Sequence, residues 1–75
     1  MEMCLDGLRL NSWATVVRIN APETLACRLR ACGIIPGTRV CCRYRTPCGG
    51  VTALEARSSV IALRTRDMAH IRVAC

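Results

Sequence analysis

Apolar and charged side chains alternate from Thr38 to Arg45, and this pattern limits what the chain can fold into more than any other feature. The residues expected to face the interior are Val40, Cys42 and Tyr44. The residues expected to face water are Arg39, Cys41, Arg43 and Arg45. Successive side chains of a β-strand point to opposite faces, so a period of two predicts a strand with one buried face.

A hairpin is expected directly after this strand. Residues 46–50 are a Pro- and Gly-containing loop, and residues 51–56 have the composition of a returning strand. We expect Arg45 to pair with Val51. This register sets Cys42 opposite Leu54 and Tyr44 opposite Thr52 on the inner face. Glu55 then lies on the outer face, diagonal to two arginines of the first strand, where its charge relieves their mutual repulsion.

A helix is expected between the first and second strands. Asn20 is a candidate N-cap, with Glu23 at the capping-box distance and Pro22 in the first turn. Gly33 is typical of a helix C-terminus. The apolar stripe expected to face the core is Leu25, Leu29 and Cys32.

The remaining pattern predicts a small barrel. The other elements expected are strands at 13–19, 60–64 and 70–74, a Pro-Gly turn at 34–37 and a helical turn at 65–69. Five short strands with one helix after the first predict a mainly β fold, a small SH3-like five-stranded barrel. We expect one domain over residues 1–75, because a chain this short holds one core.

Every positive side chain is an arginine, and the eleven arginines exceed the five acidic residues to give a net charge of +6. Arginine-favouring codons would explain the absence of lysine but not the excess of charge. Guanidinium groups bind carboxylates and phosphates in a planar, bidentate manner and stay charged at any physiological pH. The composition therefore indicates an acidic partner.

The seven cysteines form neither a paired framework nor a zinc ribbon, since their number is odd and no C-x-x-C occurs. Residues 1–6 carry no basic segment followed by an apolar one, so we expect no secretion signal. We therefore expect a cytoplasmic protein with reduced thiols. No apolar run is long enough to span a membrane.

Short motifs from about residue 8 to residue 74 match a known pattern. They are Ala14-x-Val16-x-x-Ile19, Leu25-x-x-x-Leu29-x-x-x-Gly33-Ile34-x-Pro36-Gly37-Thr38-x-Val40, Pro47-x-Gly49, Ile61-Ala62-Leu63-Arg64 and Ala69-x-Ile71-x-Val73. Together they resemble the FeoA family, the stand-alone ferrous iron transport protein A of bacteria. The chain departs from the family at Ser58, where glycine is usual, and at Gly50, where an acidic residue is usual.

The resemblance implies an SH3-like cytoplasmic accessory module for bacterial ferrous iron uptake. Its implied partner is FeoB, the large GTPase-containing membrane permease, contacted at its cytoplasmic GTPase region. The anionic inner face of the membrane would also suit the arginines. Related domains occur in metal-dependent repressors, but those need a helix-turn-helix, for which this chain has no length.

Catalytic groups are scarce. The chain has a single histidine, His70, its acids are scattered, and no Gly-rich loop ends in Gly-Lys-Ser/Thr. Cys32 and Cys42 could act as nucleophiles only beside a base, and both are expected in the core. We expect no enzymatic activity and no cofactor.

Two other binding functions stay open. A metal could be held by thiols only in a mixed set, with Cys41, Cys48 and a residue of a second copy meeting at a dimer contact. A small basic barrel could instead bind nucleic acid. Base stacking needs aromatic platforms, and the chain has only Trp13 and Tyr44, the latter expected inside. We therefore expect no nucleic-acid partner.

The candidate partner-binding surfaces are the arginine stripe and the helix. The stripe is Arg39, Arg43 and Arg45, for which a merely solvated face is the alternative. On the helix the candidates are Leu25 and Arg28, although Leu25 also fits the core. No metal ligand is assigned beyond the alternative set with Cys41 and Cys48.

Overall fold

The computed structural model describes residues 1–75 and is dominated by β-strands. The strands are β1 (Glu2–Cys4), β2 (Trp13–Ile19), β3 (Arg39–Arg45), β4 (Val51–Ala56), β5 (Ser59–Arg64) and β6 (Ile71–Ala74). The helical segments are the 3-10 turn η1 (Leu5–Gly7), α1 (Glu23–Ala31) and α2 (Thr65–Met68). The predicted mainly β class with one helix ahead of β3 is confirmed.

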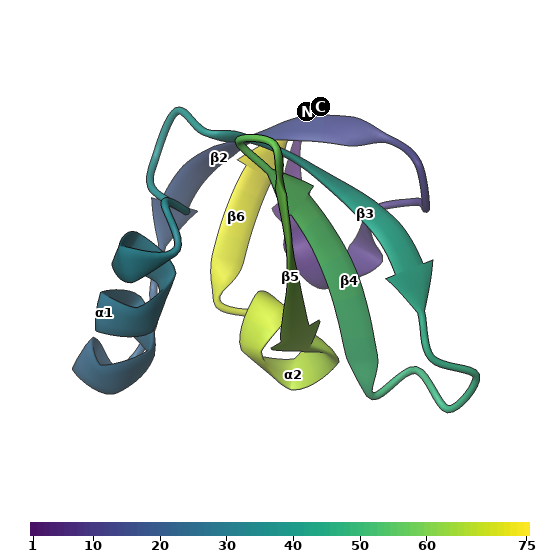
Figure 1. Ribbon diagram of the computed structural model, residues 1–75. Coiled ribbons are helices and arrows are strands. Elements are labelled where there is room, and N and C mark those ends of the chain that lie inside the picture. The colour runs from purple at the N-terminus through teal and green to yellow at the C-terminus, as the bar shows by residue number, and fades with distance from the viewer.

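All six strands belong to one antiparallel sheet in the order β1-β6-β2-β3-β4-β5. Figure 1 shows the strands arranged around a common interior, with α2 near one end and α1 beside β2. The expected number of five strands is wrong, because β1 adds to β6 through Glu2–Cys4. Three residues are too few for a period of two to be recognised.

The interior is a single apolar cluster to which every strand except β1 contributes buried side chains. Its members are Leu5, Leu8, Ala14, Val16, Leu25, Leu29, Ile34, Val40, Cys42, Leu54, Ala56, Leu63, Met68, Ile71 and Val73. Full burial of a large apolar side chain stabilises the fold by about 1.5–3 kcal/mol. The pairing of β2 with β3, and of β3 with β4, places residues that are far apart in the sequence on one outer surface.

Helix α1 ends as expected and begins differently. Gly33 takes a φ of +82°, the Gly33 amide donates to the Arg30 carbonyl, and the Ile34 amide donates to the Leu29 carbonyl, which together form a Schellman motif. The N-cap is Pro22 and not Asn20. Asn20 instead exchanges hydrogen bonds with His70, since its amide and carbonyl both contact that residue.

The helix stripe is narrower than predicted. Leu25 and Leu29 are buried in the core, but Cys32 is exposed. Cys32 is the C-cap residue, where its amide is hydrogen-bonded to carbonyls of the preceding turn and its side chain lies in water. Its expected place in the core is wrong for this reason.

The hairpin of β3 and β4 has the predicted register only in its first half. Cys42 lies opposite Leu54, as expected, but a β-bulge at Arg43 then shifts the pairing by one residue. Arg45 consequently pairs with Thr52 instead of Val51. Tyr44, expected inside opposite Thr52, lies opposite Ala53 and is 57% exposed.

None of the helices is both long enough and apolar enough to cross a bilayer.

Candidate protein-binding surface

Trp13 opens β2 on the outer side of the sheet. Its neighbours Ala14 and Val16 alternate into the core, and Trp13 itself remains 39% exposed. The residue directly opposite Trp13 on β3 is Cys41. The indole therefore lies against the middle of the strand on which the sequence predicted an arginine stripe.

Two arginines of that strand flank the indole. Arg39 and Arg43 lie two residues before and two residues after Cys41, and the guanidinium carbon of each is 5.4 Å from the centre of the Trp13 ring. Exposed cation–π contacts of this kind contribute about 0.5–1 kcal/mol each. We call Trp13, Arg39 and Arg43 the tryptophan–arginine surface.

A carboxylate and an amide fix one of the two arginines. Arg43 donates from Nε to Glu55 Oε1 at 2.7 Å and from Nη1 to Asn11 Oδ1 at 3.2 Å. The hydrogen bond to Glu55 raises the pKa of Arg43 above its ordinary value. The predicted relief of charge repulsion by Glu55 is thus confirmed for Arg43. Arg39 is exposed and forms no ion pair with a carboxylate.

Arg45 does not belong to this surface, and its expected exposure on the stripe is wrong. The bulge at Arg43 turns Arg45 toward the loop before β2, where Nη2 donates to the carbonyls of Leu8 at 2.6 Å and Asp6 at 3.2 Å. Its Nε is enclosed and has no hydrogen-bond partner. Arg45 therefore acts as an internal tie between β3 and η1.

The bulge brings Tyr44 to the outer face in exchange. Tyr44 lies opposite Ala53, which alternates with the buried Leu54 and so shares the outer face with Glu55. Reasoning from alternation missed this aromatic residue and also missed the position of Trp13. The second omission has a signal in the sequence, because Ala14 and Val16 mark the inner face and leave Trp13 outside.

The helix candidates are separated from this surface. Leu25 is 9% exposed and is a member of the core cluster. Arg28 is exposed on α1 and makes no hydrogen bond or ion pair with the tryptophan–arginine surface. Its neighbour Arg30 pairs with Glu23 of the same helix at 3.0 Å.

The structure does not bring the two candidate metal-ligating thiols together. Cys41 is fully buried, whereas Cys48 is exposed at the tip of the β3–β4 hairpin. Cys41 was expected in water but lies between Trp13 and Glu55 on the neighbouring strands, which cover it. No three His, Cys, Asp or Glu side chains lie close enough to hold a metal ion.

The thiols of the hairpin differ in acidity. A hydrogen bond with the Thr46 hydroxyl, at 3.5 Å, lowers the pKa of Cys48 below its ordinary value. Burial raises the pKa of Cys42, which packs in the core. Cys42 is therefore an inert apolar side chain, as expected from its place on the inner face.

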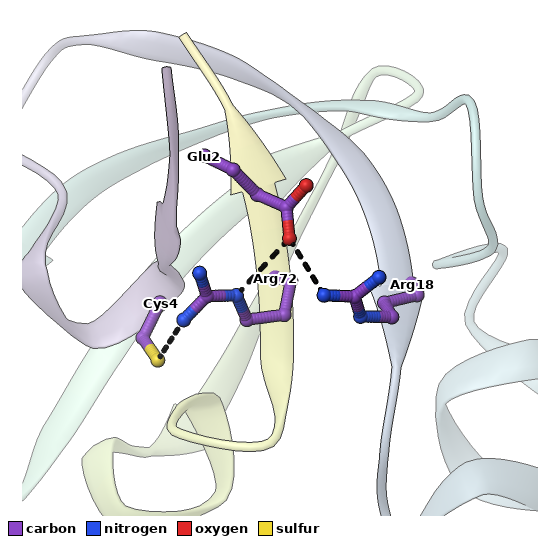
Figure 2. Close-up of polar contacts among 4 residues, drawn as sticks. All are labelled: Glu2, Cys4, Arg18 and Arg72. Carbon is purple, nitrogen blue, oxygen red and sulfur yellow. Dashed lines mark hydrogen bonds and ion pairs between the residues drawn. The ribbon is translucent and has the colours of Figure 1, made fainter.

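A second group of arginines is held within the sheet. Arg18 of β2 and Arg72 of β6 lie directly opposite one another, and both donate to Glu2 Oε1, at 2.9 Å and 3.4 Å (Figure 2). Arg72 also donates to Cys4 Sγ at 3.2 Å, a contact that, with Glu2, raises the pKa of Arg72. Like charges directly opposite each other destabilise a strand pair. Glu2 reduces the repulsion between the two arginines, and its two ion pairs also hold β1 against β6 and β2.

The fold and the surface define a small SH3-like domain that presents an exposed indole between two guanidinium groups. The FeoA domain profile matches residues 3–75, nearly the whole sequence. The chain belongs to the FeoA family.

Solved structures confirm the predicted SH3-like fold. The FeoA protein of Chlorobium tepidum has a TM-score of 0.91 at 21% identity, over 96% of this chain and 69% of its own. The FeoA of Stenotrophomonas maltophilia, a prokaryotic SH3-domain protein in complex with zinc, has a TM-score of 0.81 at 28% identity, over 95% and 88%. A manganese-dependent transcriptional repressor matches with 41% of its own length at a TM-score of 0.88, 22% identity and 97% coverage of this chain. No curated protein matches the chain.

The FeoA domain is a non-catalytic accessory domain associated with ferrous iron transport. Membership of the family confirms the expectation that this chain is not an enzyme. On this domain the structure places an exposed tryptophan between two arginines of the neighbouring strand.

Proposed function

We propose that this chain is a cytoplasmic accessory protein of ferrous iron uptake that docks on the GTPase region of a FeoB-type permease through its tryptophan–arginine surface. The observation that carries the proposal is the position of Trp13, exposed on the sheet with Arg39 and Arg43 each 5.4 Å from its ring. Family membership supports the part of the proposal that concerns ferrous iron transport. The tryptophan–arginine surface supports the part that concerns how the chain contacts its partner.

The residue types of this surface favour protein binding. Tryptophan and arginine are enriched among the few interface residues that carry most of the binding free energy. The two guanidinium groups are already ordered against the indole, so a partner does not have to immobilise them. Tyr44, exposed on the same outer face, extends the contact area.

The charge of the surface favours an acidic partner. Arg39 forms no ion pair with a carboxylate, and Arg43 forms one, with Glu55. The net charge of the whole chain is +6. Complementary charge accelerates encounter and fixes orientation more than it strengthens the final complex. A permease that binds this surface must therefore present an acidic patch on its GTPase region.

Binding of the permease's isolated cytoplasmic region tests this proposal. The variant R39Q/R43Q should bind at least about tenfold more weakly, chiefly through slower association. The matched control R64Q/R66Q removes the same charge from two exposed arginines that form no ion pair. It should bind nearly as the parent does, measured by surface plasmon resonance at one fixed ionic strength.

Two outcomes would contradict the proposal. Equal loss in both variants would mean that only net charge matters, as for adsorption to an anionic membrane. Unchanged binding in R39Q/R43Q would mean that the arginines are merely solvated, and the exposed face of α1 around Arg28 would replace them as the candidate.

A further inference from the structure

Three sulfur-containing side chains lie on one face at the β1–β6 edge of the sheet. Met3 pairs with Val73, and the ladder continues past Glu2 and Ala74 because the Cys75 amide donates to the Met1 carbonyl at 3.0 Å. Met1 is therefore opposite Cys75, and Met3 is two residues further along. Since side chains alternate with a period of two, all three point to the same side.

The sulfur atoms of Met3 and Cys75 lie together at a cavity that the exposed Met1 also lines. Cys75 Sγ lies 3.5 Å from Met3 Sδ. A cavity of about 350 Å³ is lined by Met1, Met3 and Cys75 together with Gly7, Leu8, Arg9 and Ser12. A Cβ on residue 7 would lie 3.1 Å from Met3 Cε, so Gly7 leaves room for the thioether.

This arrangement suits a metal that prefers sulfur. Thiolate and thioether ligands are soft and select Cu(I) over Fe²⁺, Mn²⁺ or Mg²⁺. Two sulfur atoms 3.5 Å apart can share one cation at a bond length of about 2.3 Å, the value typical of thiolate coordination.

We propose that Met1, Met3 and Cys75 form a binding site for one soft monovalent cation, Cu(I), at the β1–β6 edge. On binding, the Cys75 thiol releases its proton to water and forms a sulfur–metal bond, while Met1 and Met3 donate thioether lone pairs without releasing a proton. One thiolate with one monovalent cation is neutral. Arg9, which lines the cavity, therefore opposes a divalent cation more than it opposes Cu(I).

The site is separate from the tryptophan–arginine surface and from the proposed transport role. It also differs from the expected pair of Cys41 and Cys48, which the fold keeps apart. Cys4 lies on β1 as well, but it alternates to the opposite face and contacts Arg72. This gives the site a matched internal control.

Silver(I), a redox-silent soft monovalent ion, is the probe for the first test. The exposed Cys27, Cys32 and Cys48 are first replaced by serine, so that they do not compete. With ¹³C-methyl-labelled methionine, the Met1 and Met3 signals should shift and saturate at one equivalent of silver(I). Met68 is fully buried in the core, and its signal should not move.

Competition for Cu(I) against a chromogenic chelator under anaerobic conditions is the second test. In the same serine background, C75A and M3L should each lose about tenfold or more in affinity, since even an outer-shell partner of a metal costs that much. C4A should bind as the background does. Leucine conserves the packing of Met3, so M3L keeps the fold. A Met3 methyl that does not respond to silver(I), or equal affinities in C75A and C4A, would overturn the proposal.

Discussion

Arg45 shows how a single residue can change its role when a strand is bulged. Its guanidinium donates two hydrogen bonds to the carbonyls of Asp6 and Leu8, in a segment far away in sequence. Asp6 lies in η1 and Leu8 directly follows it, in the segment that leads into β2, where Trp13 begins the strand. The side chain therefore helps to position the tryptophan–arginine surface without belonging to it.

We expect R45Q to destabilise the protein by about 1.5–3 kcal/mol, the range for hydrogen bonds that involve a charged group. R39Q removes the same charge from an exposed side chain whose one stabilising contact is with the Trp13 ring, and it should destabilise the protein by no more than about 1 kcal/mol. Urea denaturation monitored by circular dichroism measures both. Equal stabilities for the two variants would mean that the Arg45 contacts contribute nothing to folding.

Cys48 should be the most reactive thiol of the folded protein. Its pKa is lowered by the Thr46 hydroxyl, so its thiolate persists at a lower pH than that of an ordinary exposed cysteine. At about pH 7.5 iodoacetamide should modify it fastest, while the buried Cys41 and Cys42 should not react until the chain unfolds.

A pair of Thr46 variants tests the cause of this reactivity. T46V removes the hydroxyl and should slow the modification of Cys48 near neutral pH, with little effect once the pH exceeds the ordinary thiol pKa. T46S keeps the hydroxyl and should react as the parent does. A neutral-pH rate that is the same in T46V and the parent would rule out the Thr46 contact as the cause.

The turn between β4 and β5 places two non-glycine residues in the left-handed region. Its two central residues, Arg57 and Ser58, have φ values of +51° and +67°. A two-residue hairpin turn of this kind requires positive φ at both positions and favours glycine. Serine occupies a position where the family usually has glycine, so the strand connection is retained at some cost in stability.

Replacing Ser58 with glycine should stabilise the protein by about 0.5–1 kcal/mol, because glycine adopts the left-handed conformation without the steric cost of a Cβ. S59G is the control, since Ser59 is the first residue of strand β5 and glycine weakens extended segments. Thermal unfolding should therefore give a higher Tm for S58G and a lower Tm for S59G. A lower Tm for S58G would show that the turn is not strained.

The fold could largely be predicted from sequence, because alternation and helix-stop signals are local. The pattern of β3 places Val40 and Cys42 inside correctly. It cannot reveal the bulge at Arg43, since one extra residue in a strand does not change the type of residue found there. After the bulge, every side chain points to the opposite face from the one that alternation predicts. Tyr44 and Arg45 were misplaced for this single reason.

The candidate surface could be predicted only in part. Alternation places Arg39 and Arg43 outside, but it does not show what lies across from them. Trp13 meets them because β2 and β3 pair with Trp13 opposite Cys41, a register set by tertiary structure. The two strands are separated by helix α1 in the sequence, so the pattern within either strand alone does not reveal their register.

At the scale of the whole molecule, contacts within the protein already occupy several of the eleven arginines. Glu2 forms ion pairs with both Arg18 and Arg72. Glu23 forms an ion pair with Arg30. Arg45 donates hydrogen bonds to backbone carbonyls. Arg39 and Arg43 lie beside the exposed indole, and of the two only Arg43 pairs with a carboxylate, that of Glu55. Other exposed arginines, among them Arg28, Arg64 and Arg66, also form no ion pair. The contact with an exposed indole, and not unpaired charge alone, therefore distinguishes Arg39 and Arg43 as the surface for an acidic partner.

Chemical-shift mapping tests this account most directly. The ¹⁵N-labelled chain is titrated with the unlabelled cytoplasmic region of a FeoB-type permease, and the indole N–H of Trp13 serves as the reporter at the centre of the surface. We expect the largest changes at the Trp13 indole and at the amides of β3 from Arg39 to Tyr44, with α1 unaffected. Changes confined to α1, with the indole signal unmoved at saturation, would contradict the claim that the tryptophan–arginine surface is the docking site.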